Sequence, residues 1–299
     1  MPEAEKIYYI NRQTGRTEEE LIYAGSALRF LYGSKKGRLV ATLLAKFPLI
    51  SQFMGWWHRR SWTKKKISPF ITQFGVVASE FEKSVESYPS FDAFFVRTLK
   101  KESRPLAPGP IIPADGRYLF YQDIATCDGF VIKGKKFSLE KLVGAESLAK
   151  NYADGSMVIA RLCPSDYHRF HFPVECTPGP TRLINGPLYS VNPIAVKRNI
   201  DLLTENKRMI TELKTDYYGT ILFIEIGATN VGSIHQTFCP GTSYKKGDEK
   251  GYFSFGGSSL ILLFEKGRIR FADDLLINSA QHIETLCLMG QPLTSLAPS

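Results

Sequence analysis

The chain has 299 residues, 43% of them hydrophobic and 22% charged, a composition that provides enough apolar surface for a core and excludes disordered and collagen-like proteins. Its 38 basic and 29 acidic residues give a formal charge of +9, and residues 1–79 contribute +8 of it, with 13 basic and five acidic side chains. The first residues lack the basic-then-apolar order of a secretory signal, and the five scattered cysteines contain no Cys-x-x-Cys pair. We therefore expect a cytoplasmic chain without a disulfide framework or a cysteine-ligated zinc site.

The first third of the chain is predicted to be helical and cationic. From Leu21 to Ser79 it has no acidic residue, ten basic residues and all three tryptophans. A short strand is expected at Ile7–Ile10, and a helix is expected to start at Thr17, where an N-cap residue precedes three glutamates. The predicted helices cover Thr17–Tyr32, Arg38–Lys46 and Ile50–Trp62, and a fourth begins at Ser68. The most apolar stretch, Leu39–Trp57, contains Lys46 and Pro48, so no segment is expected to span a bilayer.

Beyond about residue 105 the pattern changes to short β-branched and aromatic runs separated by turn residues. Strands are predicted at Arg117–Gln122, Gly129–Ile132, Ser156–Leu162, Thr220–Ile226, Gly251–Phe255, Ser259–Glu265 and Arg268–Phe271. Asp201–Lys214 is predicted to be the main helical exception. The sequence thus predicts an α+β protein, with an N-terminal helical domain at 1–104 and a β-rich domain at 105–299 that forms a mostly antiparallel barrel or sandwich.

Three short motifs in the β-rich part contain the residues of a hydroxyl-activating site. They are Pro113–Gly116, Asp166–Pro173 and Phe255–Ser259. Singly, the first is typical of a turn, the second of two unrelated histidines and the third of a glycine loop. Together they supply an aspartate, a histidine and a serine, with which an imidazole can take the proton of a hydroxyl nucleophile. The His168-x-x-His171 pair lacks a third ligand, so no metal site is expected.

The surroundings of Ser258 differ from those of a hydrolase serine. No Gly-x-Ser-x-Gly turn is present, because two glycines precede Ser258 and the apolar run Leu260–Phe264 follows it. A serine that follows glycine can instead attack the carbonyl immediately before it, since glycine leaves that carbonyl unobstructed. The residues alone leave open an Asp-His-Ser hydrolase that acts on external esters, and a non-catalytic basic protein that binds lipid or nucleic acid.

These motifs resemble those of the phosphatidylserine decarboxylases, self-processing pyruvoyl enzymes of phospholipid synthesis. The resemblance also includes Phe94–Arg97, Arg104-Pro105, Gly186–Pro193, Glu205–Arg208, Gly227–Thr229, Val231–Ile234 and Lys246–Gly251, in the same order. One departure lies at the processing site, where bacterial members commonly have Leu-Gly-Ser-Thr and this chain has Gly256-Gly257-Ser258-Ser259. Alignment on the glycine makes Ser258 the processed residue, and Ser259 stands in place of the threonine.

The resemblance implies a catalytic cycle and a role for each motif. Ser258, activated by His171 and oriented by Asp115, attacks the carbonyl of Gly257, and the chain is cleaved between the two residues. Ser258 becomes a covalent pyruvoyl group at the start of a 42-residue chain, which stays associated with the long chain. The pyruvoyl group then serves as the electron sink for decarboxylation of phosphatidylserine to phosphatidylethanolamine. His168 is assigned to the substrate side, as proton donor or carboxylate contact, and the family suggests a homodimer.

The cationic segment admits three interpretations. A solvated basic face is the usual one, and nucleic-acid binding lacks any accompanying motif. A monotopic membrane surface explains both the cations and the tryptophans, because aromatic rings prefer the interface and cations are attracted to anionic lipid. We therefore expect peripheral binding to an anionic bilayer at the cytoplasmic face of the cell membrane, and no nucleic acid. The expected contacts are Trp56, Trp57, Trp62, Arg59, Arg60, Lys64, Lys65 and Lys66.

Overall fold

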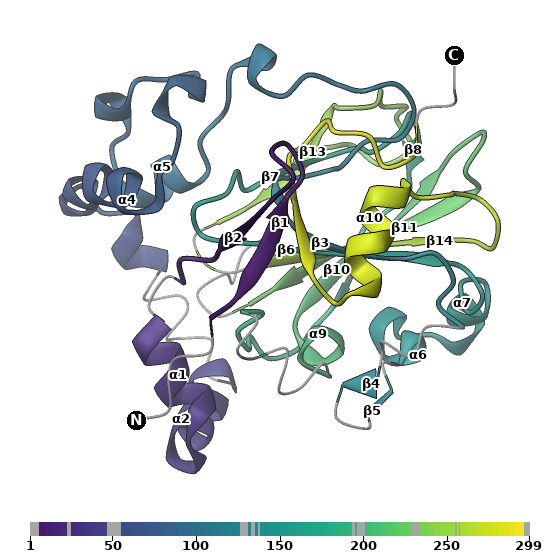
Figure 1. Cartoon of the computed structure of the whole chain (residues 1–299), viewed down its shortest axis with the longest axis horizontal. Helices are drawn as coiled ribbons and strands as arrows, with labels where there is room; N and C mark the ends of the chain where they lie inside the picture. Colours follow the sequence, from purple (N-terminus) through teal and green to yellow (C-terminus); the bar gives the residue numbers. More distant parts are fainter. Residues whose placement is uncertain are drawn as a thin grey trace.

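The structure is a computed structural model that describes most of the chain (Figure 1). The described residues are 6–22, 25–46, 55–125, 131–132, 135–136, 138–192, 195, 201–228, 234–254, 256 and 258–295. Within them the fold is mixed α/β and is dominated by one large, mostly antiparallel sheet.

The large sheet crosses the centre of the molecule (Figure 1). Its strands, in spatial order, are β2 (Arg16–Glu19), β1 (Tyr8–Asn11), β15 (Glu284–Cys287), β3 (Gly116–Tyr121), β6 (Ser156–Leu162), β14 (Ser258–Phe264), β11 (Thr220–Gly227), β10 (Arg208–Lys214) and β8 (Thr177–Pro178), with β9 (Arg182–Ile184) also paired to β10. The pairing of β1 with β15 is parallel, and the other described pairings in this sheet are antiparallel. The described edge strands β2 and β8 do not meet, so the sheet is open. Of the two expected forms, barrel or sandwich, the closed barrel is not formed by the described strands.

The central strands are buried on both faces. Along β6, Val158, Ala160 and Leu162 belong to one apolar cluster, while Met157 and Ile159 belong to another, because alternate side chains of a strand point to opposite faces. A three-stranded sheet of β12 (Ile234–Gln236), β13 (Glu249–Phe253) and β7 (Arg169–His171) contributes to the first cluster, as does α10 (Asp273–Ala280). The second cluster includes residues of α6 (Leu139–Val143), α7 (Glu146–Lys150) and α9 (Asp201–Glu205). The strands β4 (Val131–Ile132) and β5 (Lys135–Lys136) pair antiparallel in a separate two-stranded sheet.

Helices of the N-terminal third gather at one side of the sheet (Figure 1). They are α1 (Gly25–Gly33), α2 (Lys35–Lys46), α4 (Ile67–Phe74) and α5 (Phe91–Phe95), with 3-10 turns η1 (Ser61–Lys66), η2 (Ala78–Glu80), η3 (Val85–Ser87) and η4 (Lys101–Ser103). An aromatic cluster that includes Phe70, Phe81 and Phe94 joins α4 to α5. Residues of α1 and α2 instead pack with Ala195 and Leu202 of the C-terminal part. Among the described residues no helix is long and apolar enough to cross a bilayer.

Several predicted elements need correction. The helix expected from Thr17 begins only at Gly25, because Arg16–Glu19 pairs with β1 and Glu18 accepts a hydrogen bond from the Tyr9 hydroxyl at 2.8 Å. The strand near Ile7–Ile10 is confirmed, although it belongs to the sheet of the C-terminal part.

The region 201–214 is half helix and half strand. It turns to strand at Arg208, since the alternately buried residues of β10 fit against β11. No strand forms at Arg268–Phe271, whereas the strands predicted near residues 117, 156, 220, 251 and 259 are present. Parts of the helix predicted at 50–62 and of the strand predicted at 129–132 lie outside the described residues.

Candidate active site

Ser258 is the first residue of β14, and its hydroxyl is buried with no hydrogen-bond partner among the described residues. It pairs with Leu162 and shares a strand face with Leu260 and Leu262, so it faces the side of the large sheet that the β12–β13–β7 sheet covers. The hydroxyl of Ser259 donates a hydrogen bond to the carbonyl of Ala160 at 2.6 Å. Of the two adjacent serines, only Ser258 therefore has a hydroxyl left for chemistry. Gly257 lies outside the described residues.

His168 lies on the loop between β6 and β7, and one of its ring nitrogens is unpartnered. Nδ1 donates to the carbonyl of Asp166 at 2.9 Å, whereas the buried Nε2 has no partner among the described residues. Because a carbonyl can only accept, the neutral ring carries its proton on Nδ1 and a lone pair on Nε2. The ring packs on Phe95, with centroids 3.9 Å apart, and burial lowers the pKa of His168 to about 3. His168 therefore rests as a neutral base.

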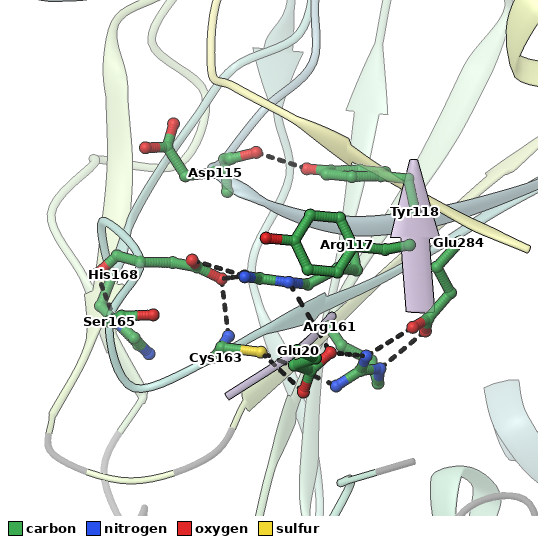
Figure 2. A network of polar contacts seen from close by, with 12 residues as sticks. Glu20, Asp115, Arg117, Tyr118, Arg161, Cys163, Ser165, His168 and Glu284 are labelled. Atoms are coloured by element: carbon green, nitrogen blue, oxygen red, sulfur yellow. Dashed lines mark hydrogen bonds and ion pairs between the residues drawn. The ribbon is translucent and has the colours of Figure 1, made fainter. Parts of the chain in front are cut away.

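The loop that carries His168 is fixed by a buried ionic network (Figure 2). The carboxylate of Asp166 accepts from the backbone N–H of Cys163 at 2.7 Å and forms an ion pair with Arg117. Arg117 pairs across the sheet with Arg161, and the two positive charges are balanced by Glu20, which lies 2.9 Å from Arg161, and by Glu284. Since Glu20 immediately follows β2, the N-terminal segment is part of the support for this loop.

His171, at the end of β7, has partners on both ring nitrogens. Nδ1 donates to the carbonyl of Gly247 at 2.9 Å, so Nε2 accepts from the Tyr167 hydroxyl at 3.3 Å. Burial lowers the pKa of His171 as well. The carboxylate of Asp115 accepts from Arg104 at 2.6 Å and from the backbone N–H of Met289 at 2.8 Å. Among the described residues no hydrogen bond joins Asp115 to His171 or either of them to Ser258, so the expected triad is not assembled as a hydrogen-bonded chain.

The two sheets that carry these residues are connected near the site. Phe253 in β13 donates from its backbone N–H to the carbonyl of His168 at 2.9 Å, and Ser258 follows five residues later. A fully buried ion pair between Lys250 of β13 and Glu225 of β11 further ties the small sheet to the large one. Breaking such a pair leaves an uncompensated buried charge, so its removal is expected to cost about 3–5 kcal/mol. The relative positions of His168 and Ser258 thus depend on how the two sheets are joined.

Sequence reasoning gave no role to several residues that support the site. Arg104 binds Asp115, Tyr167 binds His171, and Arg97 donates to the carbonyls of Ser165 and Asp166. All three lie within the segments that carry the family resemblance, and that position was the only available signal. Arg97 binds backbone carbonyls 68 and 69 residues away, and Arg104 lies 11 residues from Asp115, so no spacing rule identifies these contacts. Tyr167 is four residues from His171, but His171 is in a strand, so this separation is not a helical spacing either. Within the described ranges, no group of three or more His, Cys, Asp or Glu side chains is arranged to hold a metal ion.

The expected membrane contacts form an exposed basic and aromatic surface. Trp56, Trp57 and Trp62 are 42%, 39% and 47% exposed, and the ring of Trp62 contacts each of the other two edge to face. Arg60 lies 4.2 Å over the ring of Trp56. Arg59, Lys64, Lys65 and Lys66 are also exposed, and none of these described cations forms an ion pair with a described acid. Their charges are therefore available to an external anionic surface.

Comparisons with known proteins agree with these motifs. The model of the phosphatidylserine decarboxylase family matches residues 91–293, a range that contains Asp115, both histidines and Ser258. The protein named phosphatidylserine decarboxylase proenzyme in Chlamydia felis is 50% identical over 291 residues, which cover 96% of this chain and 97% of that protein. Proteins of the same name from Chlamydia pneumoniae and Chlamydia trachomatis serovar L2 are 49% and 46% identical, and each match covers 97% of both chains.

Proposed function

Because this chain belongs to the phosphatidylserine decarboxylase family, we propose that it is a proenzyme that cleaves itself between Gly257 and Ser258 and then decarboxylates phosphatidylserine to phosphatidylethanolamine. The observation that supports this processing site is the contrast between the two serines. Ser258 has a buried hydroxyl without a partner among the described residues, and the Ser259 hydroxyl is bound to Ala160. An orphaned buried hydroxyl is costly to keep, and such groups are concentrated where chemistry requires them.

The cofactor of this proposal is a pyruvoyl group made from Ser258. Its carbonyl supplies the electron sink for the bond that breaks when carbon dioxide leaves. The residues present fit such a group, since position 258 is buried at the start of a central strand and faces the layer that carries both histidines. The resemblance assigns activation of Ser258 to His171, oriented by Asp115. Because these side chains have other partners in the structure, this assignment requires them to rearrange during cleavage.

His168 is proposed to move the proton of the decarboxylation. Its unprotonated Nε2 takes a proton from the ammonium of the substrate serine and returns it to the carbon that loses carbon dioxide. The hydrogen bond from Nδ1 to Asp166 holds the ring in this tautomer. The same free Nε2 also makes His168 the competing candidate for the base that activates Ser258, and variants of the two histidines distinguish the roles.

We also propose that the surface formed by Trp56, Trp57, Trp62, Arg59, Arg60 and Lys64–Lys66 binds an anionic bilayer at its cytoplasmic face. Exposed tryptophans beside exposed cations, such as Arg60 over the ring of Trp56, are typical of interfacial segments. The free thiols Cys163, Cys176, Cys239 and Cys287 are compatible with a reducing compartment. Phosphatidylserine is itself anionic and stays in the bilayer, so docking brings substrate and site together.

The division into domains 1–104 and 105–299 stays a prediction. Residues 61–103 have an aromatic cluster of their own, while β1 and β2 extend the large sheet. The homodimer that the family suggests also stays a prediction, which a light-scattering mass of twice the 33.6-kDa chain tests.

Intact-mass measurement of the purified protein under denaturing conditions tests the proposed function. We expect a 257-residue chain and a 42-residue chain with a blocked, carbonyl-reactive N-terminus, together with carbon dioxide release from vesicles that contain phosphatidylserine. A hydrolase that uses the same residues on external esters, or a non-catalytic binding protein, gives one 299-residue chain and no carbon dioxide. That result contradicts the proposal.

A further inference from the structure

Arg97 is a buried arginine with unused hydrogen-bond donors beside the candidate active site. It directly follows α5 and Val96 and is 4% exposed. Its Nη2 donates to the carbonyls of Ser165 and Asp166 at 2.9 and 3.0 Å, and the second of these carbonyls also accepts from His168. Nε and Nη1, which carry three of the five N–H groups of a guanidinium, have no partner among the described residues.

The charge of Arg97 also lacks a carboxylate in direct contact. The two nearby acids, Asp115 and Asp166, form ion pairs with Arg104 and Arg117, and within the described ranges Arg97 forms none. Burial lowers the pKa of Arg97 to about 10, so the side chain still carries its charge at neutral pH. Burying a cation without an anion costs several kcal/mol. An arginine whose only role is to stabilise the fold can have all of its guanidinium nitrogens hydrogen-bonded.

Arg208 provides the comparison within the same molecule. It is 3% exposed, and each of its guanidinium nitrogens donates to a backbone carbonyl, of Leu142, Asn206 or Lys141. The fold therefore supplies an acceptor for each guanidinium nitrogen of Arg208, whereas two of the three guanidinium nitrogens of Arg97 have no acceptor among the described residues.

Tyr88 adds another unpartnered donor on the same aromatic support. Its ring packs edge to face against Phe81 and Phe94, with centroids 6.4 and 6.0 Å apart, and the guanidinium of Arg97 lies 5.2 and 5.0 Å from the same two rings. Tyr88 is 4% exposed, and its hydroxyl has no partner among the described residues. The hydroxyl of Tyr88 and the guanidinium of Arg97, which contacts the loop of His168, thus both have donors without a partner among the described residues.

We propose that Arg97 and Tyr88 bind the phosphodiester of the phosphatidylserine headgroup, an inference that rests on the function proposed above. A phosphodiester carries one negative charge and two free oxygens, which match a guanidinium edge and a phenol. The substrate carboxylate is the other available anion. It loses its charge as carbon dioxide forms, so a strong ion pair with it stabilises the ground state more than the transition state and opposes the reaction. The phosphate is unchanged throughout and can be bound without that cost.

The test measures binding of glycerophosphoethanolamine, which has the phosphodiester and no carboxylate, to the self-cleaved protein by calorimetry. Tyr88→Phe and Arg97→Gln are expected to raise its Kd about tenfold or more, since each removes hydrogen bonds to a charged group. Binding of ethanolamine, which lacks the phosphate, is expected to stay the same, and KM for phosphatidylserine in mixed micelles is expected to rise. Wild-type affinity for glycerophosphoethanolamine in both variants, or an equal loss of ethanolamine binding, overturns the proposal.

Tyr152→Phe is the matched control for Tyr88→Phe. The Tyr152 side chain is equally buried, but its hydroxyl donates to the carbonyl of Thr220 at 2.9 Å. Tyr152→Phe is expected to lower Tm and leave the Kd unchanged. Tyr88→Phe is expected to keep or raise Tm and weaken binding, and the reverse result assigns Tyr88 a purely structural role and overturns its part in the proposal.

Binding of inorganic phosphate tests whether the anion that Arg97 binds is the phosphodiester of the substrate or free phosphate. If it binds in an Arg97-dependent manner and competes with phosphatidylserine, the subsite belongs to the substrate, as proposed. If it binds without competing, free phosphate is the ligand and the assignment to the substrate is wrong. The decarboxylase function is tested separately by the intact mass and carbon dioxide release of the wild-type protein, so either conclusion can fail without the other.

Discussion

The basic surface at residues 56–66 has cations that form no ion pair with a described acid, and the site around Ser258 has polar atoms without a hydrogen-bond partner among the described residues, but the two environments are opposite. At the basic surface the charges of Arg59 and Lys64–Lys66 are exposed, so water solvates them and their cost to folding is small. Near Ser258, the unpartnered atoms of His168, Arg97 and Ser258 are buried, where each costs on the order of 1–3 kcal/mol. The exposed cations contribute to binding in proportion to their number, so the loss of one has a small effect. Each buried group near Ser258 is expected to have a specific role in the reaction, so its loss has a large effect.

The sharpest test of this contrast lies between two neighbouring serines. Ser258→Ala removes the unpartnered hydroxyl and is expected to abolish self-cleavage and all decarboxylation, leaving one 299-residue chain in the mass spectrum. Ser259→Ala removes the hydrogen bond to Ala160 and is expected to cost about 1 kcal/mol of stability while cleavage persists. Cleavage in Ser258→Ala protein would show that position 258 is not the nucleophile.

The two histidines separate cleavage from decarboxylation. His168→Ala removes the free Nε2 and is expected to leave cleavage intact while kcat for carbon dioxide release falls about 100-fold or more. His171→Ala is expected to leave the chain uncleaved. The ratio of cut to uncut chain and the rate of carbon dioxide release are measured on the same samples. If His168→Ala blocks cleavage and His171→Ala does not, the two assignments must be exchanged.

At the basic surface, effects are expected to add in small steps. Each cation near an anionic membrane contributes about 1 kcal/mol, so changing Lys64, Lys65 and Lys66 to Gln is expected to weaken binding to phosphatidylserine vesicles roughly 100-fold. Sedimentation with vesicles measures this, and the difference is expected to shrink at 1 M salt. Changing the exposed Lys150, Lys214 and Lys266 to Gln alters the net charge equally and serves as the control. Equal losses in both triple variants would argue against a localised docking surface.

Burial of His168 also predicts a pH dependence of stability. Its folded pKa of about 3 is below the value of about 6.5 expected in the unfolded chain, so only the unfolded state takes up this proton between those values. Stability from this group is complete above pH 6.5 and is lost as the pH falls toward 3. His168→Asn is expected to reduce the slope of unfolding free energy against pH by up to about 1.4 kcal/mol per unit in that window.

Denaturant unfolding at several pH values measures this slope. His282→Asn is the control, because His282 is exposed and Asn tolerates its positive φ of 57°. An unchanged slope in His168→Asn protein would mean that His168 titrates in the same way in both states.

The sequence alone determined the family, the strands β3, β6, β11 and β14 of the large sheet and the identity of the candidate reactive residues. Continuous β-branched and aromatic runs such as Ser156–Leu162 have a period and length that fit a doubly buried strand, and that pattern is local. Local patterns also misled at Thr17, where a capping residue and three glutamates favoured a helix. The edge of the large sheet offered Arg16–Glu19 a strand partner in β1, and tertiary pairing outweighed the local preference.

Only the tertiary structure decided which side chains have hydrogen-bond partners. The sequence could not show that Ser259 is bound and Ser258 is not, that Asp115 binds Arg104, or that Arg97 keeps unused donors beside His168. The physical reason is that a hydrogen bond depends on where strands far apart in sequence are placed. Ser258 meets Leu162 and Gly227 across the sheet, and His168 meets Phe253 between sheets. Residue types show which reactions are possible, and the packed sheets determine which groups are left to perform them.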